Sequence, residues 1–380
     1  MQSLLRRGAS LFTPSPSPSP SQSKPSTPAP NARPILSSAD FTKAPAPESL
    51  FDKTDPATDG DECEHDCATC TIKYPAKFDV DQEDELYGHV NGWSTHLLVA
   101  TGKTDWVRDV ADEEGSVMEA VERGGVVPGN GKLKLSASNM PVPDEYHSHE
   151  KGQQPTTVLL LPSFTIIDHV TPALVPDLIR NFVNPAVTNT TPLNGVPKPA
   201  PVSDNTETGT MTEEQVMTSL RSRPCPHAAV ILLCSQKTRD ARCGQSAPLL
   251  RREFDRHLRP LGLHRDLDDE RPGGVGIYFI SHVGGHKYAA NVIVYRRRDF
   301  DWHKAGEAQV PGAEAESETP AVNANVKNTD EGASQCIWLA RVRPEDCENI
   351  VRYTVLQGKV VKPGTQLRGG FDRERGLISW

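Results

Sequence analysis

Two short stretches of this 380-residue chain each offer a pair of side chains that bind transition metals. The first pair is Cys234 and Cys243, spaced C-x8-C, and the second is His282 and His286, spaced H-x3-H. Thiolate and neutral imidazole are the side chains that bind zinc and iron most readily. Each pair lies where an apolar run gives way to a polar segment. The four residues therefore make one candidate metal site.

Two metal chemistries fit these four ligands. Zinc would take all four on one ion, as a closed Cys2His2 structural site. A 2Fe–2S cluster would take the cysteines on one iron and the histidines on the other, or one of each on each iron. The spacing alone favours zinc and leaves the cluster open.

A second group of thiols lies in an acidic segment. Cys63, Cys67 and Cys70 form C-x3-C-x2-C. They are candidate redox thiols, and they could also bind a metal if a fourth ligand came from elsewhere in the chain. Cys225 precedes the first strand of the C-terminal half and is a spare ligand at most.

The two ligand pairs meet only if the chain brings their loops to one place. Apolar runs predict strands that end at Cys234 and cover Val275 to Ser281. If these strands are neighbours in one sheet, both loops emerge at the same edge. Gly284 and Gly285 would let the histidine turn fold tightly. The same half is expected to hold a helix at 246–258, strands at 290–295 and 336–342, and a helix at 344–357.

The N-terminal half shows a similar order of elements without the ligands. Strands are expected at 93–101, 132–138 and 157–161, and helices at 109–121 and 174–183. Alternating strands and helices predict an α/β fold. The N-terminal unit is interpreted as a related, degenerate copy of the C-terminal one. The expected division is a presequence-like segment and Ser/Pro-rich linker at 1–60, an N-terminal α/β domain at 61–186, a linker at 187–223, a second domain at 224–362 with a flexible insertion at 297–335, and a tail at 363–380.

Composition narrows the class of protein. A net charge of -9 offers no basic stripe for nucleic acid. No apolar run approaches the roughly 20 residues that span a bilayer. Eight cysteines in so long a chain favour metal or redox chemistry in a reducing compartment over a disulfide scaffold. Arg6 and Arg7 with no acidic residue before Asp40 are typical of a mitochondrial presequence, with the cytoplasm as the alternative location.

Several motifs together resemble the sucrase/ferredoxin-like family. They are Cys-Ser-Gln-Lys-Thr-Arg-Asp-Ala-Arg-Cys-Gly at 234–244, His-Val-Gly-Gly-His-Lys at 282–287, Asn-Val-Ile-Val-Tyr at 291–295, Arg-Gly-Gly at 368–370, the terminal Trp380, and Ala-Thr-Gly-Lys-Thr-Asp-Trp at 100–106. The resemblance implies a thioredoxin-like ferredoxin domain in the C-terminal half. It implies a 2Fe–2S cluster held by Cys234, Cys243, His282 and His286.

The resemblance also implies a role in electron transfer. The chain would be a carrier in mitochondrial redox homeostasis or thiol quality control, with a redox protein and the iron–sulfur assembly machinery as partners. Histidine ligands would raise the potential of the cluster and couple it to protons. Lys237, Arg239, Arg242 and Lys287 could steer an acidic partner. Trp380 could pack on the domain, be recognised by the assembly machinery or serve electron transfer.

Two rival functions remain from the residues alone. One is a zinc-stabilised interaction protein, and the other is a thiol oxidoreductase that uses Cys63, Cys67 and Cys70. The sequence shows no pair of carboxylates in a glycosidase-like setting, so it gives no support to a hydrolase. A non-enzymatic carrier is therefore preferred to an enzyme.

Overall fold

The computed structural model describes residues 37–147, 149–150, 152–193, 220–298 and 331–380. The presequence-like segment, the Ser/Pro tract and most of the insertion at 297–335 lie outside these residues. The described residues belong to one compact unit. None of their helices is long and apolar enough to cross a bilayer.

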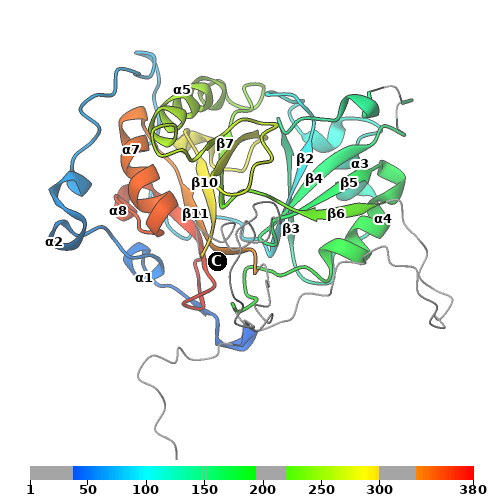
Figure 1. The fold of residues 1–380 in the computed structure, drawn as a ribbon, viewed down its shortest axis with the longest axis horizontal. Coiled ribbons are helices and arrows are strands. Elements are labelled where there is room, and N and C mark those ends of the chain that lie inside the picture. The colour runs from blue at the N-terminus through cyan, green and yellow to red at the C-terminus, as the bar shows by residue number, and fades with distance from the viewer. Residues whose placement is uncertain (1–36, 148, 151, 194–219, 299–330) are drawn as a thin grey trace, which may run out of the picture. The chain divides into compact units, whose positions relative to one another are not determined.

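Thirteen strands of the described residues form one mixed sheet (Figure 1). Their order is β1-β13-β12-β11-β10-β7-β9-β3-β2-β4-β5-β6, with β8 paired to β9. The strand bounds are β1 (Thr42–Lys43), β2 (Thr95–Ala100), β3 (Leu133–Ser138), β4 (Thr156–Leu161), β5 (Thr165–Val170), β6 (Arg221–Pro224), β7 (Ala229–Cys234), β8 (His264–Arg265), β9 (Val275–Ile280), β10 (Val292–Arg297), β11 (Ala333–Leu339), β12 (Leu367–Asp372) and β13 (Leu377–Ile378). The predicted α/β fold class is confirmed, and the C-terminal half is consistent with a thioredoxin-like fold.

The α-helices of the described residues pack their apolar side chains mainly against one face of the sheet. They are α1 (Pro47–Leu50), α2 (Pro56–Asp59), α3 (Val117–Arg123), α4 (Val175–Leu178), α5 (Ala241–Leu258), α7 (Cys347–Asn349) and α8 (Pro363–Gln366). Short 3-10 turns lie at η1 (Ser38–Asp40), η2 (Asp61–Glu64), η3 (Val110–Asp112), η4 (Asp144–Tyr146), η5 (Pro172–Leu174), η7 (His286–Tyr288) and η8 (Pro344–Asp346), of which η5 and η8 run directly into α4 and α7. α4 and α7 each continue into a π-helical segment, η6 (Ile179–Val183) and η9 (Ile350–Val355).

The two halves of the sheet repeat one pairing pattern. In the C-terminal half β7 runs parallel to β9 and antiparallel to β10, which continues antiparallel to β11 and then β12. In the N-terminal half β2 runs parallel to β3 and antiparallel to β4, which continues antiparallel to β5 and then β6. Both halves also place a Pro-initiated, π-distorted helix after the fourth strand. In this pairing pattern Ala100 stands at the place of Cys234. That the N-terminal half is a degenerate copy of the C-terminal one stays a prediction.

The halves join edge to edge in the middle of the sheet. β3 and β9 are antiparallel, with Ser138 opposite Ile280. Asn139 extends the contact, because its backbone N–H donates to the Phe279 carbonyl at 3.1 Å and its Oδ1 accepts from the Phe279 N–H at 2.7 Å. The strands of both expected domains therefore share one continuous sheet.

Alternating side chains of the central strands fill a core on each face. Leu97 and Val99 of β2 belong to the cluster that also takes in Phe254 of α5 and Ile350 of η9. Leu98 points into the second cluster, on the face without these helices. There the aromatic rings of Trp93, Trp338, Tyr295, Phe371 and the half-buried Trp380 provide the cover. Because side chains alternate between the two faces of a strand, a strand that is buried on both faces, such as β7, is apolar along most of its length.

Some expected boundaries differ from the structure. The helix expected at 246–258 begins at Ala241, because Asp240 caps it by accepting from the Arg242 N–H. The helix expected at 109–121 is two pieces, since Gly115 has a positive φ and Ser116 starts a new cap. β10 extends through Arg297 and β11 begins at Ala333, inside the range expected to be a flexible insertion.

Parts of the range expected to be a disordered linker and of the expected C-terminal tail belong to the fold. Leu50 and Phe51, in the range assigned to the linker, are fully buried. The expected C-terminal tail contributes β12 and β13 to the sheet.

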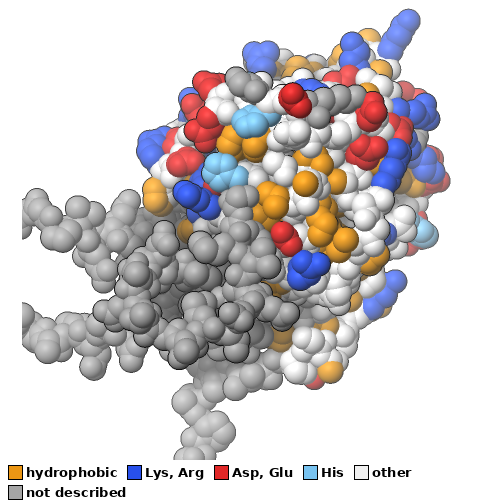
Figure 2. All heavy atoms as spheres, turned by 90° about the vertical axis from the view of Figure 1, so that its right-hand side faces the viewer, with side chains coloured by type: hydrophobic (Ala, Val, Ile, Leu, Met, Phe, Trp, Pro, Cys, Tyr) orange, Lys and Arg blue, Asp and Glu red, His pale blue; other side chains and the backbone are white. Residues whose placement is uncertain are grey.

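On the face shown in Figure 2, acidic and basic side chains are interspersed around small apolar groups.

Candidate metal centre

Cys234 and His282 leave the same edge of the sheet. Cys234 is the last residue of β7 and is paired in register with Ile280, the last residue of β9. His282 follows two residues later. The Cys234 Sγ lies 3.9 Å from the His282 Nδ1. The parallel pairing of the two strands thus brings the two loops together, as their expected adjacency required.

Cys243 completes a group of three ligand atoms. The two sulfurs and a ring nitrogen of His282 all lie within 4.8 Å of one another. Cys243 lies in the first turn of α5, not in the loop where the sequence pattern placed it. The positive end of a helix dipole stabilises negative charge in that turn. The location therefore favours a thiolate ligand.

His286 is only partly described. Its backbone begins the 3-10 turn η7, four residues after His282. The position of its side chain lies outside what the structure describes. Its role as the fourth ligand stays a prediction.

The pKa values of the two thiols are shifted in opposite directions. A hydrogen bond with Cys243 and a second with His282 lower the pKa of Cys234 despite its burial. The hydrogen bond with Cys234, together with burial, raises the pKa of Cys243. Cys234 is therefore the first of the two thiols to lose its proton. A buried thiolate beside an imidazole is a donor set that suits zinc or an iron–sulfur cluster.

Gln236 holds the cysteine loop against the histidine turn. Its Oε1 accepts a hydrogen bond from the His282 N–H at 2.8 Å, and its Nε2 donates to the Val107 carbonyl at 2.6 Å. The amide is 1% exposed. One side chain therefore fixes the backbone of a ligand and the loop of the other half at once.

The loop after β2 also supports the cysteine loop. The Asp105 carboxylate accepts hydrogen bonds from the N–H and hydroxyl of Thr238, at 3.0 and 2.8 Å. Ser235 donates to the Thr104 carbonyl at 2.8 Å. This loop is the Ala100–Trp106 motif, and it stands where a cysteine loop would lie in the N-terminal half. The N-terminal half thus supports the loop that carries the ligands.

Arg368 supports the histidine turn from the other side. Its Nη1 donates to the Gly284 carbonyl at 2.9 Å and to the Asn291 Oδ1 at 2.8 Å. Its guanidinium lies 4.2 Å from the centroid of the Trp338 ring. Burial lowers the pKa of Arg368 to about 10, so it keeps its charge at neutral pH. Gly285 has a positive φ, and a Cβ there would meet the guanidinium at 2.4 Å.

Gln236, Asp105 and Arg368 were not singled out by sequence reasoning. Each lies inside a motif that carries the family resemblance, and membership of that motif is the sequence signal that could have identified it. Their partners are far away in the chain, so spacing alone could not assign them.

The other candidate residues do not join this centre. Cys67 lies near His257 and Glu348, whereas the Cys70 thiol donates to the Ile72 carbonyl. Cys63 is buried, and Cys225 lies beside Phe164 next to β5. The three cysteines of the C-x3-C-x2-C motif therefore do not converge on one point. The ring of Trp380 packs 5.1 Å from that of Trp93, on the face without helices.

Two of the four basic residues that could steer a partner are engaged within the chain. Lys287 forms ion pairs with Asp84 and Asp81. Arg242 pairs with Asp240 at 2.8 Å. Lys237 is exposed at the rim of the cysteine loop. Charge complementarity to an acidic partner would therefore depend on Lys237 and Arg239.

Comparison with known proteins gives one family and several fungal relatives. The sucrase/ferredoxin-like family model matches residues 86–369. Actin patches distal protein 1 of Saccharomyces cerevisiae is 30% identical over 259 residues, which are 64% of this chain and 75% of that protein. Altered inheritance of mitochondria protein 32 of Clavispora lusitaniae is 32% identical over 136 residues, which are 36% of this chain and 33% of that protein.

A second altered inheritance of mitochondria protein 32 matches over a similar length. Altered inheritance of mitochondria protein 32 of Meyerozyma guilliermondii is 29% identical over 150 residues, 40% of this chain and 35% of that protein. The chain thus spans about a third of these two relatives and three quarters of the first. No solved structure shows a significant match. Because the family model covers most of the chain and includes every motif of the centre, this protein belongs to the sucrase/ferredoxin-like family.

Proposed function

We propose that this chain binds a 2Fe–2S cluster through Cys234, Cys243, His282 and His286 and carries single electrons. The observation that supports the proposal most is the convergence of two buried thiols and an imidazole within 4.8 Å. Membership of a ferredoxin-like family favours the cluster over zinc. His286 enters as the fourth ligand because it follows His282 in the same short turn.

The chemistry of the site is divided between the cofactor and the chain. A bound cluster supplies one-electron redox chemistry. The chain supplies a thiolate at Cys234, a favourable helix terminus at Cys243, and a His282 backbone held by Gln236. Two neutral imidazoles in place of two thiolates remove about two negative charges from the centre, so the potential should exceed that of an all-cysteine ferredoxin.

The biological setting is part of the same proposal. Two of the compared relatives are named for mitochondrial inheritance and one for actin patches. We place this chain in the mitochondrion, in redox homeostasis or thiol quality control. Its partners would be a redox protein and the machinery that assembles iron–sulfur clusters. Lys237 and Arg239, beside the centre, are the charges that an acidic redox partner would meet.

Iron, sulfide and zinc content of anaerobically purified protein tests the proposal. We expect about two irons and two sulfides per chain, as a 2Fe–2S cluster requires. Cys234→Ser and Cys243→Ser should lose both. Cys336→Ala removes an equally buried thiol from β11, away from the centre, and should keep both. Protein without sulfide whose bound zinc is lost in Cys234→Ser would refute the cluster and leave a zinc-stabilised protein.

A further inference from the structure

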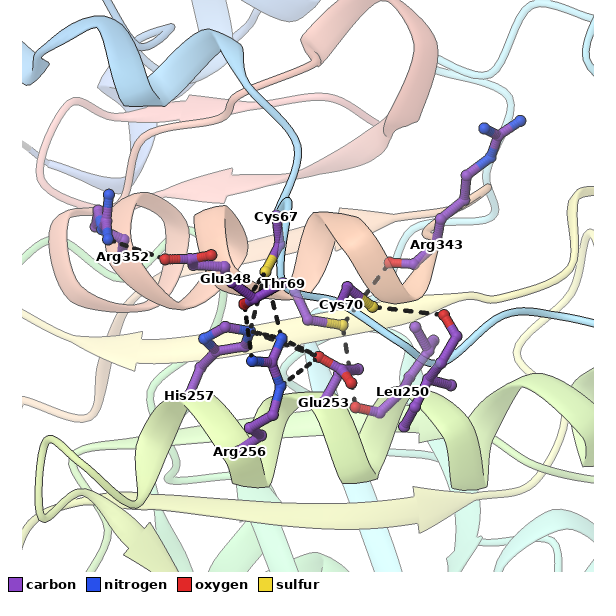
Figure 3. Close-up of polar contacts among 12 residues, drawn as sticks. Cys67, Thr69, Cys70, Leu250, Glu253, Arg256, His257, Arg343, Glu348 and Arg352 are labelled. Atoms are coloured by element: carbon purple, nitrogen blue, oxygen red, sulfur yellow. Dashed lines mark hydrogen bonds and ion pairs between the residues drawn. The ribbon is translucent and has the colours of Figure 1, made fainter.

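A second group of metal-binding side chains lies near the other end of α5. The Cys67 sulfur, a His257 ring nitrogen and a Glu348 carboxylate oxygen all lie within 4.8 Å of one another (Figure 3). They come from three segments far apart in sequence: the acidic N-terminal loop, the last turn of α5, and α7. Cys243 and His257 are 14 residues apart on α5, which is about 20 Å along the helix axis. The group is therefore separate from the centre described above.

The group is built from interior side chains. Cys67 is 9% exposed, and the His257 side chain is 13% exposed. The Cys67 Sγ lies 3.9 Å from the His257 Nε2. A hydrogen bond with Cys67 lowers the pKa of Glu348, so this carboxylate is charged at neutral pH. The Cys67 backbone N–H donates to the Glu345 carbonyl at 3.0 Å, which fixes the loop beside α7.

A positive charge already lies among these ligands. Arg256 Nη2 lies 3.3 Å from the Cys67 Sγ and 3.0 Å from the His257 Nε2. The same nitrogen pairs with Glu253 at 2.7 Å, and the Glu253 side chain is only 1% exposed. Figure 3 shows the guanidinium between the thiol, the imidazole and this carboxylate. This group of side chains therefore already holds one positive charge, as a cation site does.

The site is also accessible. A cavity of about 260 Å³ is lined by Cys67 and Glu348, together with Glu62, His65, Asp66, Ala68, Asn349 and Arg352. The Arg256 side chain is 40% exposed, so it has room to turn away. Its departure would free Glu253, whose Oε2 lies 3.6 Å from the same His257 nitrogen. A fourth donor is therefore at hand.

We propose that Cys67, His257 and Glu348 bind a zinc ion. One thiolate, one imidazole and one carboxylate are the three donor types of protein zinc sites, and a thiolate disfavours magnesium and calcium. Binding displaces the guanidinium from the sulfur and releases the thiol proton to solvent, with no change in oxidation state. The ion would tie the acidic N-terminal loop to α5 and α7. This site does not depend on the proposed cluster.

Metal analysis of the full-length protein with its cluster bound tests the site. After dialysis against a weak chelator, the wild type should retain about one zinc per chain. Cys67→Ser and His257→Gln should lose that zinc at unchanged iron and sulfide content. Cys70→Ser is the matched control, since it removes a neighbouring thiol that faces the Ile72 carbonyl, and it should keep the zinc. Zinc-edge X-ray absorption should show a single sulfur at about 2.3 Å.

Two further variants keep the test decisive. Glu348 is at the edge of the cavity, so Glu348→Gln should fold normally and weaken zinc binding by roughly tenfold or more. Cys234→Ser should lose iron and keep zinc. Zinc that survives Cys67→Ser, or that disappears with Cys234→Ser, would overturn the proposal. So would a folded wild-type protein that retains no zinc.

Discussion

At the scale of single residues, the side-chain amide of Gln236 links the two halves of the molecule. Its oxygen accepts from the His282 N–H in one half, and its nitrogen donates to the loop after β2 in the other. Its Nε2 faces the carbonyls of Trp106, Val107 and Arg108. A carboxylate in the same place would meet three oxygens and donate nothing. The identity of the amide, and not only its size, therefore matters here.

Gln236→Glu should destabilise the protein by about 2 kcal/mol or more, because a buried hydrogen bond is lost and acceptors are left unpaired. The cluster should also be released faster in the variant, since the His282 N–H shares this support. Chemical denaturation and the decay of visible absorbance measure the two effects. Gln245→Glu makes the same change at an exposed position of α5 and should be nearly neutral. Equal behaviour of the two variants would contradict this account of Gln236.

His227 is a buried histidine far from the ligands. Its Nε2 lies 2.9 Å from the Tyr278 hydroxyl, and its Nδ1 has no hydrogen-bond partner in the structure. Burial lowers the pKa of His227 to about 4. The folded protein therefore holds the neutral imidazole through the mildly acidic range.

This histidine should make stability fall as pH falls from about 6.5 to about 4. In that window the unfolded chain binds a proton at His227 and the folded chain does not, so protons favour unfolding. The full loss would be about 3 kcal/mol, because each pH unit between the unfolded and folded pKa values of this imidazole contributes about 1.4 kcal/mol. His227→Gln should be less stable at pH 8 and should show a shallower decline between pH 6.5 and 4. An unchanged slope in urea denaturation across this range would rule out His227 as a source of the acid sensitivity.

At the scale of elements, the histidine turn is shaped by two adjacent glycines with different surroundings. Both Gly284 and Gly285 have positive φ angles. A Cβ at Gly284 would meet nothing within 4 Å, whereas one at Gly285 would meet the guanidinium of Arg368. The pair therefore separates backbone strain from loss of the arginine contact.

Gly284→Ala should cost about 1 kcal/mol of stability, from the left-handed backbone alone. Gly285→Ala should cost more, because Arg368 must also leave the Gly284 carbonyl and the Trp338 ring. Thermal unfolding of the two variants gives the comparison. If Gly284→Ala proves the more harmful, Arg368 is not what holds the turn.

The strands that stand out most clearly in the sequence are those with continuous apolar runs. β2, β4, β7 and β9 are central and buried on both faces, so each stands out from its polar flanks. β12 was missed because Leu-Arg-Gly-Gly-Phe-Asp lacks that signature. Its Gly370 is needed where a Cβ would lie 1.9 Å from the Cys336 carbonyl oxygen. Such a strand is specified by the neighbour it approaches, which no local pattern contains.

The same limit applies to the candidate centre. The C-x8-C and H-x3-H pairs are local patterns, and parallel neighbouring strands bring them to one edge. The side chains that position them act over long separations, as Gln236 does with Val107 and Arg368 with Gly284. The second group of ligands shows this too, since Cys67 was visible in the sequence while His257 and Glu348 join it only through the fold.

At the scale of the whole molecule, one sheet runs through two related halves. Among the strands of the described residues, only β3 and β9 connect them within the sheet, but Gln236, Asp105 and Ser235 add contacts between the loops. The half without ligands therefore contributes to the centre as a support. Loss of either half should disturb the other.

We expect the two halves to unfold together. Hydrogen exchange at rising urea should give β2 and β7 the same opening free energy and the same midpoint, as strands of one cooperative unit do. Peptides that cover Thr95–Ala100 and Ala229–Cys234 report the two sites. A lower midpoint for the N-terminal half would show that it folds as a separate domain.

The ligands of the centre can be tested directly by pulsed EPR of the chemically reduced protein, comparing the wild type with His282→Cys. We expect a paramagnetic 2Fe–2S signal with couplings to two imidazole nitrogens. His282→Cys should keep the cluster, lose one nitrogen coupling and shift to a lower potential, because a neutral ligand becomes a thiolate. A wild-type signal without nitrogen coupling, or no signal from folded, chemically reduced protein, would contradict the account.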